Sequence, residues 1–211
     1  MLGRYSSHSN LPVSTQIDIM MTLGLRLLVL ASGILLLSLT SCNTSRQTPE
    51  QLIETYYAGF NAGDFAQIQS VVADSFTNIS EGYVTRQSLE DQYVMFQWDS
   101  VFVPSYTISD VEVLDAGVKA MVSSYSKRYA FLDHNPLTCE MTFAIADDVL
   151  NQLTVGECPG SDWDAWSARR DTLVAWIDIH HPELSGFIHD LTREGAENYL
   201  QAITLYERAM K

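Results

Sequence analysis

Histidines and carboxylates gather near the C-terminal end of the chain, where side chains of these types could hold a metal ion. His180 and His181 stand beside Glu183, and His189 stands beside Asp190. Adjacent histidines on a helix point about 100° apart, because each residue turns the helix by that angle. No two of these histidines have the HxxxH spacing that places both ligands on one helix face. We therefore predict no metal site and no cofactor.

The other residues with reactive side chains form no known catalytic pattern. The sequence contains no GxSxG nucleophile motif, no phosphate-binding GxxxxGK[ST] loop and no dinucleotide-binding GxGxxG loop. Its three cysteines are Cys42, Cys139 and Cys158, and none belongs to a CxxC pair. Zinc-ribbon and thioredoxin chemistry therefore have no support.

Cys42 ends a segment that has the three parts of an export signal. Arg26 gives a positively charged start, Leu27–Leu39 gives an apolar stretch, and the small residues Thr40 and Ser41 precede the cysteine. The apolar stretch is shorter than the roughly 20 residues that span a bilayer as a helix. The segment therefore predicts a cleaved signal peptide.

The tetrapeptide Leu39-Thr40-Ser41-Cys42 resembles the lipobox of bacterial lipoproteins. The resemblance implies a diacylglycerol thioether on Cys42, cleavage before this residue and acylation of the new amino terminus. Two or three acyl chains anchor a protein stably to a membrane. The residue after the cysteine is Asn43 and not aspartate. By resemblance to the sorting of Gram-negative lipoproteins, this implies the outer membrane, facing the periplasm.

The charge balance of the 211-residue chain limits its partners. It contains 12 lysines and arginines against 26 aspartates and glutamates, a formal net charge of −14. Phosphate backbones repel such a chain, so we predict no nucleic-acid binding. Docking on anionic lipid through a basic face is excluded for the same reason. The membrane must therefore be reached through the lipid anchor.

Helix signals follow the predicted cleavage site. Thr48-Pro49-Glu50-Gln51 is a capping box with proline at the first helical position. Asn61–Asp64 interrupts this helix, and a second helix carries Phe65, Ile68 and Val72. A third helix is expected from Thr85 to Trp98. The first helix, which begins after Thr48, has apolar residues at helical spacing: Ile53, Tyr56, Tyr57 and Phe60.

Strand signals begin after Pro104. Alternating patterns predict strands at Tyr106–Leu114, Val118–Leu132, Leu137–Ala146 and Val149–Glu157, separated by turn residues. Helices followed by a run of antiparallel strands indicate an α+β domain. Beyond it, Ser161 and Thr192 are candidate caps of two amphipathic helices.

The segments FNAGDF and VVADSF, followed by a third helix and long strands, resemble the nuclear-transport-factor-2-like superfamily, which includes SnoaL-like cyclases and ketosteroid isomerases. The resemblance implies a cone, in which N-terminal helices pack on a curved antiparallel sheet around a pocket. The C-terminal helices resemble the tail of uncharacterised Bacteroidetes lipoproteins. Homodimerisation through the sheet is also implied only by this resemblance.

The predicted organisation has four parts. Residues 1–41 form the signal peptide, with the true start at Met20 or Met21, and residues 42–47 form a tether. Residues 48–158 form the nuclear-transport-factor-2-like domain, and residues 159–211 form a C-terminal helical extension.

Similarity to ketosteroid isomerase implies a tyrosine and a carboxylate base in the pocket. The tyrosine falls on Tyr56, but the base falls near Ser80, which cannot carry the proton. The neighbouring Glu81 does not take its place, because the side chains of adjacent strand residues point to opposite faces of the sheet. Tyr56 therefore has two interpretations, a site tyrosine or a core tyrosine.

Cys139 and Cys158 lie in neighbouring predicted strands of an exported protein, where a disulfide can form. Pairing apolar residues sets Phe143 opposite Leu153 and Met141 opposite Val155, which brings Cys139 opposite Glu157. A bulge at Gly156 would bring Cys158 to the same face. The sequence alone does not decide whether this disulfide forms.

Three classes of function remain. The cone could bind a small apolar ligand, with Tyr56, Phe60, Tyr93 and Trp98 as the predicted pocket lining. The sheet or the tryptophan-rich tail could bind a protein. An isomerase, cyclase or dehydratase is the alternative, disfavoured because no catalytic set is identifiable. An open aromatic cone without acid or base would favour binding, and a carboxylate or histidine facing the cavity would favour the enzyme. A filled cone would favour the scaffold.

Overall fold

The first helix of the body begins where its capping residues predict. The computed structural model describes residues 46–211, so the predicted signal peptide and Cys42 lie outside the described residues. Thr48 accepts a hydrogen bond from the Gln51 backbone, and the Gln51 side chain accepts one from the Thr48 backbone. The helices are α2 (Pro49–Ala62), α3 (Phe65–Gln69), α4 (Leu89–Ser100), α5 (Lys127–Phe131), α6 (Trp163–His180) and α7 (Arg193–Ala209), with short 3₁₀ turns at Pro182–Leu184 and Phe187–His189.

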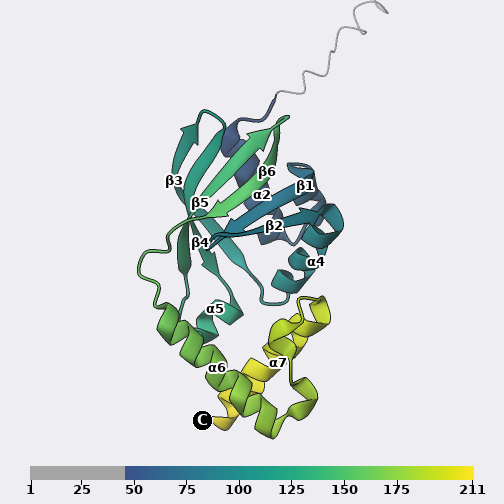
Figure 1. The fold of residues 1–211 in the computed structure, drawn as a ribbon, viewed down its shortest axis with the longest axis vertical. Coiled ribbons are helices and arrows are strands. Elements are labelled where there is room, and N and C mark those ends of the chain that lie inside the picture. Colours follow the sequence, from purple (N-terminus) through teal and green to yellow (C-terminus); the bar gives the residue numbers. More distant parts are fainter. Residues whose placement is uncertain (1–45) are drawn as a thin grey trace, which may run out of the picture. The chain divides into compact units, whose positions relative to one another are not determined.

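Six strands form one curved sheet, which contacts α2, α3, α4 and α5, while α6 and α7 pack on other helices (Figure 1). Its order is β2-β1-β6-β5-β4-β3, and every neighbouring pair is antiparallel except β1 with β6, which is parallel. The strands are β1 (Val72–Ser80), β2 (Tyr83–Ser88), β3 (Ser105–Leu114), β4 (Gly117–Tyr125), β5 (Leu137–Ala146) and β6 (Val149–Val155). The predicted α+β class, with helices on a curved sheet and a C-terminal helical extension, is confirmed.

The prediction for the segment that forms β1 and β2 was wrong. Val72 was expected in a helix and Thr85 at a helix start, but both lie in strands. Val72 pairs with Leu150 of β6, a partner far away in the sequence. The helix begins later because Ser88 and Asp91 form the capping box of α4. Tertiary pairing therefore overrides the local helical pattern here.

The predicted strand Val118–Leu132 ends early. β4 stops at Tyr125, and the Ser126 side chain accepts a hydrogen bond from the Tyr129 backbone, which caps α5. The Asn135 side chain accepts the Ser126 backbone N–H and fixes this corner. At α6, Asp162 caps the helix in place of Ser161.

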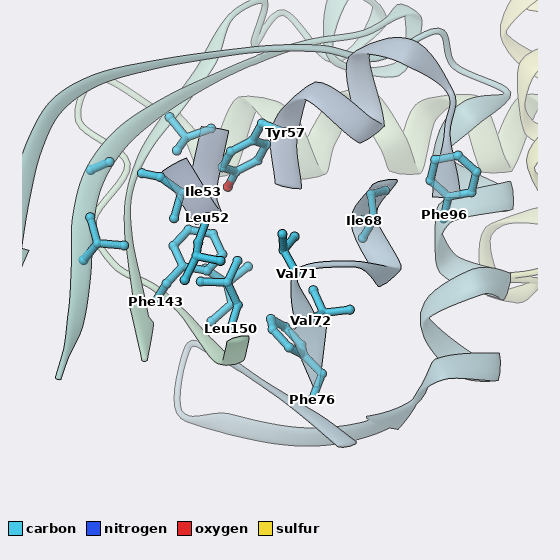
Figure 2. Packing of buried hydrophobic residues seen from close by; sticks show 14 residues of the cluster. Leu52, Ile53, Tyr57, Ile68, Val71, Val72, Phe76, Phe96, Phe143 and Leu150 are labelled. Carbon is cyan, nitrogen blue, oxygen red and sulfur yellow. The ribbon is translucent and has the colours of Figure 1, made fainter. Parts of the chain in front are cut away.

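Two apolar cores share α4, which contributes Phe96 to the first and Trp98 to the second. The first fills the space between the sheet and α2, α3 and α4, where Ile53 and Tyr57 lie near Phe143 (Figure 2). The second joins α5, α6 and α7 around Phe102, which is fully buried. The first core therefore shapes the inside of the cone, and the second attaches the C-terminal helices to the end of α4. Among residues 46–211, no helix combines the length and apolar character that crossing a bilayer requires.

Candidate functional site

A cavity of about 300 Å³ lies inside the cone, between α2, α4 and the concave face of the sheet. Its size is at the lower end of the range of about 300–1,000 Å³ found for small-molecule sites. Most of its wall is aromatic or aliphatic. Asp99, Tyr106 and Arg128 form a polar end, and other polar side chains of the wall come from β1, β2, α4 and β4. The lining consists of Tyr56, Tyr57, Phe60, Phe65, Ile68, Phe76, Asn78, Gln87, Gln92, Met95, Phe96, Trp98, Asp99, Tyr106, Ser124, Arg128, Tyr129, Met141 and Leu153.

Three of the four residues predicted to line the pocket do so: Tyr56, Phe60 and Trp98. Tyr93 does not belong to the lining. It is 43% exposed, and its ring packs against Phe65 with 5.0 Å between ring centroids. The rotation of α4 turns Gln92, Phe96 and Asp99 toward the cavity and leaves Tyr93 on the outer flank.

Asp99 supplies a carboxylate that was not among the predicted site residues. It lies near the end of α4, and its Oδ2 accepts a hydrogen bond of 2.6 Å from the Tyr106 hydroxyl of β3. Burial raises the pKa of Asp99, and the Tyr106 hydrogen bond and the Arg128 charge oppose that rise. A buried carboxyl group with a raised pKa beside a cavity is a candidate for proton transfer.

A spacing in the sequence could have indicated Asp99. Leu89, Gln92, Phe96 and Asp99 follow one another at intervals of three and four residues, so a carboxylate continues the inward stripe of a helix. A charge on such a stripe is buried only with a partner or beside a cavity.

Arg128 of α5 places a positive charge in the same wall. Its guanidinium carbon lies 4.9 Å from the Trp98 ring centroid, 4.7 Å from that of Tyr129 and 5.7 Å from that of Trp166. Its buried Nε has no hydrogen-bond partner, and it forms no ion pair within residues 46–211. Aromatic faces therefore hold this cation in place of a carboxylate.

The tyrosines of the cavity are neutral hydrogen-bonding groups. Burial raises the pKa values of Tyr56, Tyr57 and Tyr106, and the nearby Asp99 charge raises those of Tyr56 and Tyr106 further. Each therefore keeps its hydroxyl proton at physiological pH. The Tyr56 ring also packs on Phe60 and Phe143, so this residue belongs to both the core and the cavity wall.

Ser80 and Glu81 lie outside the cavity wall. They stand at the end of β1 and in the following turn, where they line a neighbouring groove. The carboxylate of the cavity therefore comes from α4, and the position suggested by similarity to ketosteroid isomerase is empty of acid or base.

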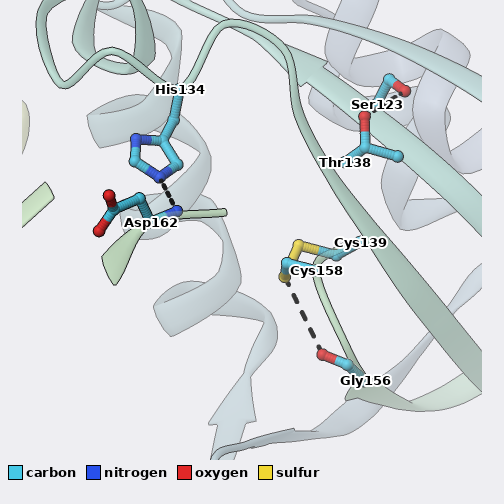
Figure 3. The surroundings of a disulfide bond; sticks show 7 residues. All are labelled: Ser123, His134, Thr138, Cys139, Gly156, Cys158 and Asp162. Carbon is cyan, nitrogen blue, oxygen red and sulfur yellow. Dashed lines mark hydrogen bonds between the residues drawn. A yellow bond between two sulfur atoms is a disulfide. The ribbon is translucent and has the colours of Figure 1, made fainter. Parts of the chain in front are cut away.

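Cys139 and Cys158 are joined by a disulfide (Figure 3). The pairs Phe143–Leu153 and Met141–Val155 have the predicted register. Glu140 then bonds to two consecutive residues, accepting from the Gly156 N–H and donating to the Glu157 carbonyl, each at 2.8 Å. This bulge advances the chain by one residue and turns Cys158 toward Cys139.

The C-terminal histidines have local partners. His180 Nδ1 lies 2.9 Å from the Trp176 carbonyl oxygen, and His181 Nδ1 lies 3.1 Å from a Glu183 carboxylate oxygen. Within residues 46–211, no three histidine, cysteine or acidic side chains gather as a metal site.

The fold and the cavity define an α+β cone with a small aromatic pocket that contains one carboxylate and one guanidinium. No family model and no curated protein matches the chain by sequence. Similar solved structures include an NTF2-like protein of unknown function from Cytophaga hutchinsonii, at 11% identity and a TM-score of 0.43, covering 53% of this chain and 91% of the other. A Kribbella flavida protein named for ketosteroid isomerase has 9% identity and a TM-score of 0.45, covering 54% and 80%. A de novo designed protein with a curved sheet has 11% identity and a TM-score of 0.44, covering 61% and 99%. These likenesses assign neither a ligand nor a reaction.

Proposed function

We propose that the body of this chain binds a small, mostly apolar molecule inside the cone. The observation that carries the proposal is the open aromatic cavity of about 300 Å³ with a polar end at Asp99, Tyr106 and Arg128. An engineered apolar cavity of about 150 Å³ holds benzene, so twice that volume suits two fused rings. A hydroxyl or carbonyl on such a ligand would find partners at the polar end. An open cavity favours this function over a scaffold with a filled cone, and the Asp99 carboxylate in its lining supports catalysis as a second function.

Calorimetric titration with naphthol, a neutral two-ring alcohol, tests the proposal. The unmodified protein should bind naphthol. Ser124→Leu should abolish binding because it adds apolar volume inside the cavity wall. Thr107→Leu is the matched control, since Thr107 is an exposed strand residue outside the lining. Equal binding by both variants, or none by the unmodified protein, would reject a ligand site in the cone.

A second function, acid–base catalysis, is favoured by Asp99. A ligand with an acidic C–H beside a carbonyl could lose that proton to the Asp99 carboxylate. The neutral Tyr56 hydroxyl lines the same cavity and could donate to the oxygen on which negative charge develops. The test is exchange of the acidic hydrogens of tetralone, a two-ring ketone, in deuterated water. Exchange that Asp99→Asn slows a hundredfold would support the enzyme; exchange at the same rate in both would oppose it.

We also propose that Cys42 carries lipid and holds the body at a membrane, most simply the outer membrane facing the periplasm. The lipobox-like tetrapeptide and the acidic body, which leaves no basic docking face, support this anchor. Mass spectrometry of membrane-fraction protein should find acyl mass on an amino-terminal Cys42. Cys42→Ser should release the protein from the membrane fraction; retention there would oppose the proposal.

A further inference from the structure

A second hollow, a groove of about 710 Å³, lies beside the cavity. The ends of β1, β5 and β6, the first residue of α6 and the disulfide form its walls. Ser124, Tyr129 and Met141 line both hollows.

The strands lead directly from the cavity into the groove. Along β6, Leu153 lines the cavity and Val155 lines the groove; along β1, Asn78 and Ser80 do the same. Side chains two residues apart on a strand point to the same face of the sheet. The groove is therefore the continuation of the cavity along the concave face, and the two hollows follow one path.

The groove has a different chemistry from the cavity. Glu81 and Glu157 are the charged residues in its lining, and neither forms an ion pair within the described part of the chain. Trp163, at 44% exposure, and Tyr129 add aromatic faces. Carboxylates together with aromatic faces attract an organic cation and disfavour an anion.

We propose that the cavity and the groove form one binding site for an elongated amphipathic amine. The ring body occupies the cavity, an alkyl chain follows the concave face, and the ammonium group lies in the groove near Glu81 and Glu157. This inference rests on the proposed function, since it needs a ligand body inside the cone, and it adds the shape and charge of the molecule.

Three naphthalene derivatives test the charge. Each carries a hexyl chain that ends in an amine, a hydroxyl or a carboxylate, and binding is measured by calorimetry. The amine should bind about fivefold more tightly than the alcohol, because pairs with solvent-accessible carboxylates contribute modestly. The carboxylate should bind most weakly. Added salt should remove most of the difference between amine and alcohol.

Variants assign the preference to the groove. Glu81→Gln combined with Glu157→Gln should make the amine and the alcohol bind equally while naphthol binding stays unchanged. Glu54→Gln is the control, an exposed carboxylate on α2 outside both linings. It should leave the amine preference intact.

The outcomes separate this inference from the proposed function. If naphthol binds but the amine gains nothing over the alcohol, or the double variant keeps the gain, the groove proposal is overturned and the cavity function stands. If naphthol and all three derivatives fail to bind, both fall. If the carboxylate binds best, the charge assignment is wrong.

Discussion

The hydrogen bond from Tyr106 to Asp99 sets the proton affinity of the carboxylate in the cavity. Tyr106→Phe removes the 2.6 Å hydrogen bond and little else, since the ring remains. A hydrogen bond to a charged group contributes about 1.5–3 kcal/mol. Asp99 lines an open cavity, so solvent can replace part of that bond, and we take about 1.4 kcal/mol. At about 1.4 kcal/mol per pH unit, the pKa of Asp99 should rise by about one unit.

The measurement is a carbon NMR titration of the Asp99 carboxyl group in the unmodified protein and in Tyr106→Phe. Tyr93→Phe is the control, because it deletes a tyrosine hydroxyl from α4 outside the cavity lining. It should leave the titration of Asp99 unchanged. If Tyr106→Phe lowers the pKa of Asp99 or leaves it unchanged, the hydrogen bond does not favour the ionised carboxylate, and our account of the polar end is wrong.

Three further predictions concern stability. Replacing Cys139 and Cys158 by serine should lower the free energy of unfolding by about 3 kcal/mol in urea titrations, since the bridge closes a loop with a sequence separation of 19. Gly59→Ala should cost about 1–3 kcal/mol by the same assay, because its Cβ would stand 2.6 Å from Ile68 Cγ1. Asp99→Asn should raise Tm at pH 7. Burial raises the folded-state pKa of Asp99, so its ionisation destabilises the fold above that pKa, and the gain should vanish at acidic pH, where the carboxyl is protonated in both states. A gain that is independent of pH would contradict this reasoning.

Elements with strong local signals could be predicted from the sequence. Thr48 and Thr192 cap α2 and α7 as expected, and the alternation of apolar residues gave the register of β5 with β6. The β1–β2 hairpin could not be predicted, because β1 is fixed by the distant strand β6 through parallel pairing. The residues of β1 and their neighbours in the sequence do not indicate that β6 pairs with this strand. Strand propensity depends on such neighbours more than helix propensity does.

The candidate site divides in the same way. Tyr56 and Phe60 lie on an apolar stripe, so their inward direction follows from helical spacing alone. Asp99 lies on a stripe too, but its chemistry depends on Tyr106 from β3 and Arg128 from α5. The tertiary fold brings these three groups together at the cavity. There, burial raises the pKa of Asp99, while the Tyr106 hydroxyl donates a hydrogen bond to it and Arg128 lies nearby. A carboxylate on the inward stripe of a helix is therefore a reason to search the fold for its partners before concluding that a pocket lacks an acid or base.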